Sequence, residues 1–266
     1  MKRYMIDLQT KGNIGKSTIK DLLGSYLTES GVKWAGFDLD SENQSFCSKF
    51  DHVKFLPMED DNTLQVLATA FKDNEADTII IDPRAHQDSI IGDFLIQTDL
   101  LSLLEKQGNR VTLVMHPYDQ LDALANIQTW FQFFGNKVDY LLIRNEKNGK
   151  NDPMWGTSNL RKAMLDSGAH EVNVPLLPVV LLQEITKIET FLRRAVTFRE
   201  LVTNQELGFH SLFSGVLNNW IKNVWSGFYE ARSIIANTPL KKVSLSQSPV
   251  IRKANRFDAS MAVGAK

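Results

Sequence analysis

The chain has 266 residues, of which 43% are hydrophobic and 23% are charged, so it can bury a sizeable core and is long enough for one large α/β domain with an appendage. Its formal net charge of −1 gives no overall basic signal for nucleic acid, and no apolar run approaches the roughly 18 residues of a membrane-spanning helix. The single cysteine, Cys47, excludes an internal disulfide framework, and residues 1–4 leave no room for a signal peptide. We therefore expect a cytoplasmic protein.

The first predicted strand, residues 4–8, and the first predicted helix, residues 17–27, flank a loop that contains glycine and lysine. Its end reads Gly-Lys-Ser, which matches the phosphate-binding loop found between a strand and a helix, although Thr10 replaces the first glycine of that pattern. In such a loop, backbone N–H groups and the helix N-terminus favour phosphate. The predicted nucleotide-binding residues of the loop are Lys11, Gly12, Asn13, Ile14, Gly15, Lys16, Ser17 and Thr18.

Two side chains of this loop carry its expected chemistry. Lys16 supplies a compact positive charge to the phosphates, and the hydroxyl of Ser17 is expected to bind Mg²⁺. The five histidines show no metal-ligand spacing, so we expect Mg²⁺ as the metal.

Strands and helices alternate along the rest of the chain, and the β-branched run at residues 78–82 is the clearest buried strand. Near-continuous apolar strands separated by helices indicate a parallel sheet covered on both faces. We therefore predict an α/β fold with a doubly wound, mostly parallel sheet, of the P-loop type. Further strands are expected at residues 32–39, 110–115 and 138–143, and further helices at residues 63–72, 90–104, 120–134 and 159–165. Residues 53–56 form a short apolar segment, and residues 172–177 are expected to form a strand or an extended segment.

An acidic residue, Asp82, ends the strand at residues 78–82. Open α/β sheets bind ligands at the carboxyl ends of their strands. In phosphate-loop proteins an acid in this position holds Mg²⁺, usually through water. Asp82 is therefore a candidate metal-binding residue, although aspartates at strand ends also serve as turn residues.

The pair Lys11 and Lys16 gives the loop a more specific resemblance. Their spacing resembles the deviant Walker A motif of the ParA/MinD family, Lys-Gly-Gly-x-Gly-Lys-Ser/Thr, with Asn13 in place of the second glycine. Asparagine tolerates positive φ better than most residues, so the loop can still form. The resemblance covers roughly residues 2–200. It implies ATP as the nucleotide and an ATP-dependent homodimer in which Lys11 reaches the partner's nucleotide.

The same resemblance implies roles for three residues further along the chain. Asp38 and Asp40 resemble the Asp-x-Asp of the family's switch I element, which implies that Asp40 positions the attacking water and that Asp38 supports Mg²⁺. Asn145 resembles the asparagine that recognises adenine at the end of a late strand, and an amide can pair with an adenine edge. The implied catalytic set is Lys11, Lys16 and Asp40.

The C-terminal part of the chain contains an apolar stripe and a basic tail. Apolar residues recur every three or four positions between Leu207 and Phe228, which is typical of a helix packed in a core or a dimer. We place a boundary after residue 238, between an ATPase domain at residues 1–238 and a flexible tail at residues 239–266. The tail has six basic residues and one acidic residue. It could therefore bind acidic lipid, nucleic acid or a partner, or remain solvated.

These observations favour an ATP-dependent dimerising switch ATPase that positions or partitions cargo such as plasmid DNA. The expected partners are a second copy of the chain, nonspecific DNA and a cargo or adaptor protein, and membrane contact through the tail is less favoured. Because residues 1–238 are acidic overall, DNA binding would need a local basic patch. Candidates for that patch are Arg193, Arg194 and Arg199, with Lys222 and Arg232 further along the chain.

Two alternative functions remain open from the sequence. One is a metabolic ligase of the broader phosphate-loop class, similar to dethiobiotin synthetase. The other is a nucleotide-binding adaptor with little hydrolysis, which is suggested by Asn13 and by the dipeptide Pro83-Arg84 after the candidate metal ligand.

Overall fold

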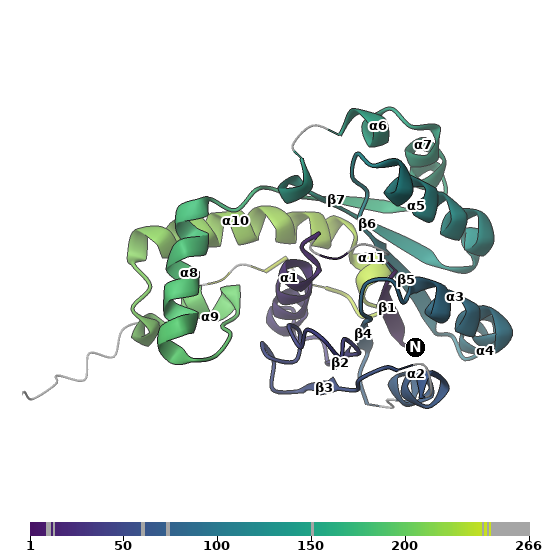
Figure 1. The fold of residues 1–266 in the computed structure, drawn as a ribbon, viewed down its shortest axis with the longest axis horizontal. Helices are drawn as coiled ribbons and strands as arrows, with labels where there is room; N and C mark the ends of the chain where they lie inside the picture. Colours follow the sequence, from purple (N-terminus) through teal and green to yellow (C-terminus); the bar gives the residue numbers. More distant parts are fainter. Residues whose placement is uncertain are drawn as a thin grey trace, which may run out of the picture.

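Seven strands form one sheet in which every neighbouring pair is parallel (Figure 1). The computed structural model describes residues 1–8, 12, 14–59, 62–72, 75–149, 152–240, 242–243 and 245. The strand order is β3-β2-β4-β1-β5-β6-β7, which places β1 at the centre and confirms the predicted doubly wound α/β fold. The strands are β1 Arg3–Asp7, β2 Trp34–Asp38, β3 Val53–Phe55, β4 Thr78–Asp82, β5 Arg110–Met115, β6 Asp139–Asn145 and β7 His170–Val174.

Both faces of the sheet are buried because alternate residues of the central strands enter two different cores. Tyr4 and Ile6 of β1 pack in one core, whereas Met5 packs in the other. In β4, Ile79 and Ile80 are divided in the same way. A strand buried on both sides needs a continuous apolar sequence, which is why these strands show no alternation of polar and apolar residues.

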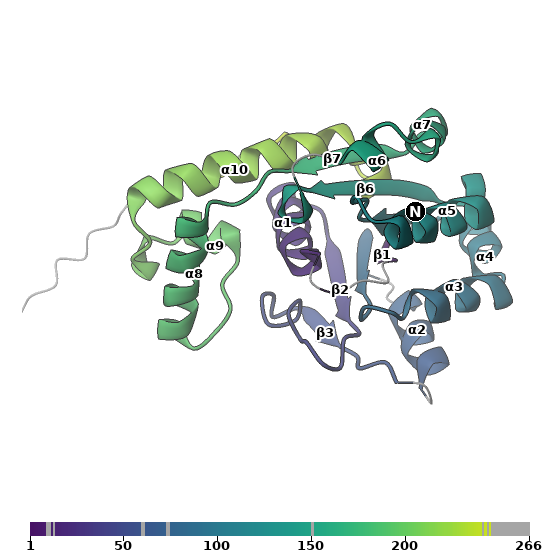
Figure 2. The ribbon, with the colours of Figure 1, turned by 45° about the horizontal axis from the view of Figure 1, so that its top comes forward.

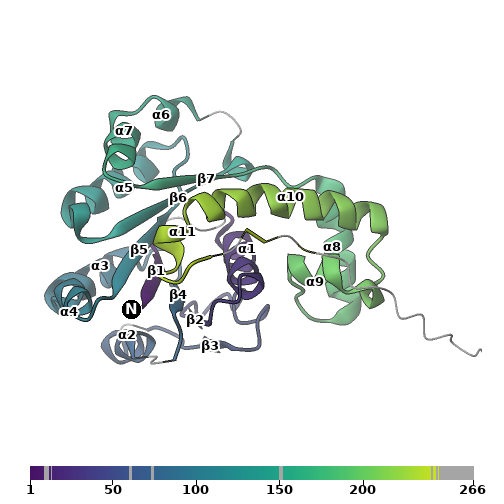
Figure 3. The ribbon, with the colours of Figure 1, turned by 180° about the vertical axis from the view of Figure 1, so that it is seen from behind.

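Helices cover both faces of the sheet (Figures 1 and 3). One core contains residues of α1 Lys16–Glu29, α8 Val179–Leu192, α9 Phe198–Thr203, α10 Ser211–Glu230 and α11 Arg232–Ile235. The other contains residues of α2 Thr63–Phe71, α3 Asp88–Gln97, α4 Leu100–Lys106, α5 Leu121–Phe134, α6 Pro153–Gly156 and α7 Asn159–Asp166. In Figure 2, α8 and α9 lie beyond the edge of the sheet and are joined to it by α10.

The sequence prediction of one helix over residues 90–104 differs from the structure, which has α3 and α4 there. The break falls at Asp99, whose φ is +47°. Aspartate enters this left-handed region more readily than most residues, because its short polar side chain can form local hydrogen bonds. Helix α8 was not predicted at all, although Pro178 stands at its N-cap and proline is tolerated at helix starts.

The predicted apolar stripe belongs to α10 and is part of the core. The indole N–H of Trp225 donates a hydrogen bond to the Leu22 carbonyl of α1 at 3.0 Å. The indole N–H of Trp220 donates to the Pro175 carbonyl, just after β7, at 2.8 Å. Helix α10 therefore fixes the helix of the phosphate-binding loop against the end of the sheet.

The region of the predicted C-terminal tail starts with packed residues. Leu240 and Leu245 are buried in the core that contains α1 and α10. Of residues 239–266, only 239–240, 242–243 and 245 fall among the described residues. No helix in the described part of the chain is both long and apolar enough to cross a membrane.

Candidate nucleotide-binding site

The predicted phosphate-binding loop leads from the end of β1 to the start of α1, at the edge of the sheet where the parallel strands end. Gly15 has φ +96°, and a Cβ atom placed on it would lie 2.3 Å from Nδ2 of Asn145. A glycine is therefore required there both by the backbone conformation and by the close approach. The predicted residues Lys11 and Asn13 lie outside the described residues.

A cavity of about 300 Å³ lies beside this loop. Its lining comes from the phosphate-binding loop, from the segment after β2, from the end of β4 and the residues that follow it, and from the segment after β6. Three residues predicted from the sequence do not line it: Ile14 of the loop, and Asp38 and Asn145 at the ends of β2 and β6. The lining residues are Gly12, Gly15, Lys16, Ser17, Thr18, Asp40, Asn43, Ser45, Asp82, Ala85 and Lys147.

The side chain of Lys16 reaches the segment that follows β4. Its Nζ atom donates a hydrogen bond to the Pro83 carbonyl at 2.9 Å. A neutral carbonyl is a weaker partner for an ammonium group than a phosphate oxygen. The lysine thus lies at the wall of the cavity in contact with an acceptor that a phosphate could replace.

Asp38 fixes the loop that follows β2. Its carboxylate accepts backbone N–H bonds from Asp40 at 3.2 Å, from Phe46 at 3.0 Å and from Cys47 at 3.0 Å. Burial raises the pKa of Asp38, and the charge of Asp82 raises it further. The predicted magnesium-supporting residue is therefore engaged, in this structure, with the backbone of its own loop.

Asp40 lines the cavity and also shapes the loop. Its Oδ1 atom accepts backbone N–H bonds from Glu42 at 2.9 Å and from Asn43 at 3.0 Å. Glu42 in turn forms an ion pair with Arg84 at 2.8 Å. The segments after β2 and β4 are consequently joined to each other beside the cavity.

A buried charge cluster lies behind the cavity wall, and three of its four members, Asp7, Lys20 and His116, were not predicted from the sequence. The ammonium of Lys20 is 2.6 Å from Oδ2 of Asp7 and 2.9 Å from Oδ1 of Asp82. Nε2 of His116 is 3.0 Å from the same Asp7 oxygen. All four side chains are at most 7% exposed. The predicted metal-binding aspartate is therefore partly neutralised by a buried lysine.

Electrostatic attraction keeps Lys20 and Asp7 charged despite their burial. Burial by itself would lower the pKa of Lys20, but Asp7 and Asp82 raise it to about 12. Burial would likewise raise the pKa of Asp7, but Lys20 and His116 hold it well below its usual value. A signal for this cluster was present in the sequence, because Asp7 ends an apolar strand and charged residues are rarely buried without a partner.

Asn145 holds the phosphate-binding loop in place. Its Nδ2 atom donates to the Ile14 carbonyl at 3.2 Å, and Nδ2 of Asn148 donates to the same carbonyl at 3.1 Å. Oδ1 of Asn145 accepts the backbone N–H of Lys147 at 3.0 Å. The end of β6 is thereby connected directly to the loop between β1 and α1.

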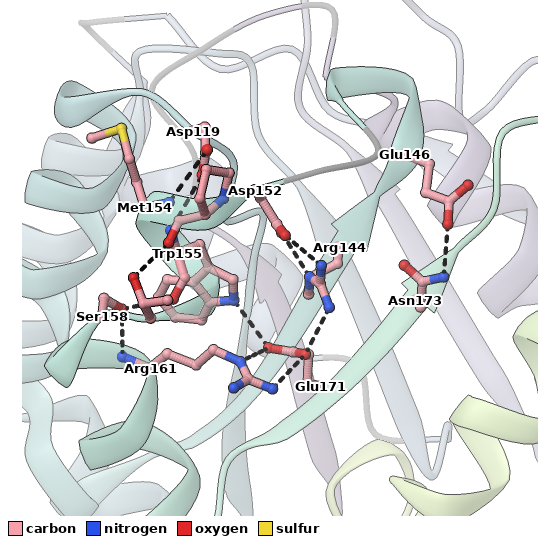
Figure 4. A network of polar contacts seen from close by, with 12 residues as sticks. Asp119, Arg144, Glu146, Asp152, Met154, Trp155, Ser158, Arg161, Glu171 and Asn173 are labelled. Atoms are coloured by element: carbon pink, nitrogen blue, oxygen red, sulfur yellow. Dashed lines mark hydrogen bonds and ion pairs between the residues drawn. The ribbon is translucent and has the colours of Figure 1, made fainter.

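A polar network fixes α6 and α7 next to the end of β6 (Figure 4). Arg144 of β6 binds Asp152, with Nε to Oδ2 at 2.7 Å, and also lies 3.4 Å from Glu171 of β7. Glu171 accepts bonds from Arg161 and from the indole N–H of Trp155. Although burial opposes it, these donors hold the pKa of Glu171 below its usual value. The network thus connects α6 and α7 to β6 and β7.

The oxygen donors beside the cavity fit Mg²⁺. This ion prefers oxygen ligands, retains several waters and is often bound by one or two protein groups together with substrate phosphates. The hydroxyls of Ser17 and Ser45 and the carboxylate of Asp82 line the cavity. Among the described residues, no group of three or more His, Cys, Asp or Glu side chains is placed to hold a metal ion.

No family model and no curated protein matches the chain. Similar solved structures include the MinC:MinD cell division protein complex of Aquifex aeolicus, at 13% identity, with 91% of this chain and 99% of that chain covered and a TM-score of 0.45. MinD complexed with Mg-ADP from Pyrococcus horikoshii OT3 has 15% identity, coverage of 90% and 100%, and a TM-score of 0.42. A plasmid partition protein from Borrelia burgdorferi has 13% identity, coverage of 66% and 90%, and a TM-score of 0.41. At these values, the case for a function rests on the chain's own residues.

Proposed function

We propose that the protein binds Mg-ATP in the cavity beside the loop after β1 and hydrolyses it as a dimerising switch that positions cargo such as plasmid DNA. The observation that carries the proposal is the convergence of Lys16, Ser17, Asp40 and Asp82 on one cavity. These residues come from three different strand ends, and each was predicted from a phosphate-loop pattern or from the ParA/MinD resemblance.

In this proposal, the loop and the start of α1 bind the phosphates through backbone N–H groups and the helix dipole. Lys16 leaves the Pro83 carbonyl to contact a phosphate. Ser17 and Asp82 hold Mg²⁺, directly or through water, and the bound ion would neutralise charge that develops on the phosphates. Lys20 limits the excess negative charge at Asp82.

For the adenine, we propose a restricted role for Asn145. One N–H of its amide is engaged with the Ile14 carbonyl, and its oxygen already accepts the Lys147 N–H. The second N–H of the amide and the second lone pair of its oxygen remain as the groups that could face a base. Asn145 would then couple base recognition to the shape of the phosphate-binding loop.

We expect ATP to drive dimerisation, as the position of Lys11 implies. Asp40→Ala should slow hydrolysis about 100-fold or more, the usual scale for losing a group that orients or deprotonates a nucleophile, and should trap the dimer. The measurement is multi-angle light scattering with and without ATP. Asp93→Ala, at an exposed position, is the matched control. A monomer with ATP bound, in both the wild type and Asp40→Ala, would count decisively against the dimer.

A nucleotide-binding adaptor with little hydrolysis is the second candidate. Two observations favour it: the Asp40 carboxylate is engaged in a turn, and Lys20 pairs with Asp82. Steady-state ATPase assays with and without DNA, lipid vesicles and candidate partner proteins separate the two functions. Tight ATP binding without hydrolysis under every condition would favour the adaptor.

The proposed DNA surface is narrower than the sequence indicated. Arg194 pairs with Glu200 and Arg199 pairs with Glu29, whereas Arg193 lies exposed at the end of α8. Nonspecific DNA binding would therefore depend on exposed cations such as Arg193 together with the basic region at residues 239–266.

Because phosphate contacts release counterions, we expect DNA binding to weaken steeply as salt rises. ATP should strengthen it, since a dimer doubles the number of contacts. The measurement is fluorescence anisotropy with random duplex DNA, with and without ATP, for the full chain and for Arg193→Ala. If no ATP-dependent binding appears at low salt, DNA is not the working surface, and a membrane or a protein partner replaces it in the proposal.

A further inference from the structure

The loop at residues 40–49 is held tightly against α1 and β2. Phe46 is 1% exposed and stacks on Trp34 with ring centroids 6.1 Å apart. Lys49 forms an ion pair with the buried Asp21 of α1 at 2.7 Å. Together with the backbone bonds to Asp38, these contacts fix the loop at both of its ends. The side chains between the two ends therefore have defined positions.

One of these positioned side chains is Ser45. Its hydroxyl lies 2.6 Å from the hydroxyl of Ser17, and both residues line the cavity. Its backbone N–H donates to the Asn43 carbonyl at 2.7 Å. A second hydroxyl, from a loop outside the phosphate-binding motif, is thus placed against the hydroxyl expected to bind the metal.

The separation of the two hydroxyls matches a shared metal ion. Mg²⁺ is octahedral, with oxygen ligands at about 2.1 Å, so two adjacent ligands lie about 3 Å apart. The observed 2.6 Å between Ser17 and Ser45 is close to this ligand–ligand distance. A small opening of the hydrogen-bonded pair would place one cation in contact with both oxygens.

The aspartates of the site have other partners. The Asp38 carboxylate accepts three backbone N–H bonds, Asp40 caps its own turn through Oδ1, and Oδ1 of Asp82 faces Lys20. The hydroxyls of Ser17 and Ser45, by contrast, form a hydrogen bond with each other at the wall of the cavity.

We propose that Ser45 binds the divalent cation of the bound nucleotide together with Ser17, and so couples the loop at residues 40–49 to the metal. The inference rests on the proposed binding of Mg-ATP. It adds a metal ligand from outside the phosphate-binding motif. It also gives the loop that carries Asp40 a direct response to the metal, because the ion replaces the hydrogen bond between the two serines.

The first test compares ATP binding by calorimetry in EDTA and in Mg²⁺, for the wild type, Ser45→Ala and Ser48→Ala. Ser48 is an exposed serine of the same loop whose hydroxyl bonds the Ser45 carbonyl at 3.2 Å, so it is the matched control. Ser45→Ala should reduce the gain in affinity that Mg²⁺ gives by about tenfold or more, the scale on which metal sites lose affinity when a supporting group is removed. Its affinity in EDTA should stay at the wild-type level.

The outcomes separate the inference from the proposed function. If the wild type binds no ATP at all, the proposed function is wrong. If the wild type gains affinity from Mg²⁺ and Ser45→Ala keeps the whole gain, Ser45 is not a ligand. Equal losses in EDTA and in Mg²⁺ would also overturn the inference, because they would show a structural effect on the loop.

A second test changes the preferred metal. Thiolates favour soft cations, whereas hydroxyls favour Mg²⁺. In a Cys47→Ser background, Ser45→Cys should lose the gain in ATP affinity that Mg²⁺ gives and should recover a gain in ATP affinity with Cd²⁺. The control variant Ser48→Cys should respond to both ions as the wild type does. If Cd²⁺ gives Ser45→Cys no more affinity than it gives Ser45→Ala, the side chain does not contact the metal.

Discussion

Lys16→Ala should abolish ATP binding at ordinary protein concentrations. A charge-assisted bond to phosphate contributes up to about 3 kcal/mol, which corresponds to a loss of about 100-fold in affinity. In the free protein the ammonium bonds the Pro83 carbonyl alone among the described contacts, so the fold should survive the substitution. Calorimetric titration with Mg-ATP gives the affinity, and circular dichroism checks the fold.

The control for this experiment is Lys33→Ala. Lys33 is an exposed lysine that pairs with Glu75 at 3.2 Å, away from the cavity. The Lys33→Ala variant should bind ATP with the same affinity as the wild type. Unchanged ATP affinity in Lys16→Ala would show that the cavity is not the nucleotide site, and would also contradict the proposed function.

Lys20→Met should destabilise the protein by about 3–5 kcal/mol, the usual effect of removing one partner from a buried ion pair. The substitution leaves Asp7 and Asp82 as two buried carboxylates without their common cation. Lys33→Met removes an exposed pair instead, and should change the free energy of unfolding by about 1 kcal/mol or less. Urea denaturation of the two variants and the wild type measures the difference. An effect of Lys20→Met no larger than that of Lys33→Met would show that the buried cluster does not stabilise the fold.

The same cluster predicts how this difference varies with pH. The pKa of Lys20 is raised from 10.5 to about 12 in the folded protein. Its contribution to stability should therefore be fully present below pH 10.5 and should be lost as the pH rises towards 12. The gap in unfolding free energy between the wild type and Lys20→Met should narrow over this interval. A gap that stays constant up to pH 12 would contradict the raised pKa.

Asp7 has the opposite dependence. Its pKa in the folded protein is lowered from 3.8, so its contribution is present above pH 3.8 and is lost as the pH falls below that value. Neither Lys20 nor Asp7 was predicted from the sequence to be important. Their importance follows from α1 packing against β1 and β4, which brings Lys20 between the two carboxylates.

The sequence by itself determined the elements that depend on local pattern. The order of strands and helices follows from runs of apolar residues, and β4 and β5 have the predicted bounds. The phosphate-binding loop could be recognised because its residues are contiguous. The left-handed conformation of Gly15 is also local, since glycine is the residue that adopts it without steric cost.

The tertiary structure alone decided which side chains meet. Ser45 reaches Ser17 because Phe46 packs on Trp34 of β2 and Lys49 pairs with Asp21 of α1, which together hold the loop of Ser45 in place. Lys20 and Asp82 are 62 positions apart and meet only when the sheet and α1 are packed. Such pairings depend on long-range packing that leaves no periodic trace in the sequence. The motif could therefore be recognised beforehand, whereas the position of Asp7 could indicate a buried charge but not which residues pair with it.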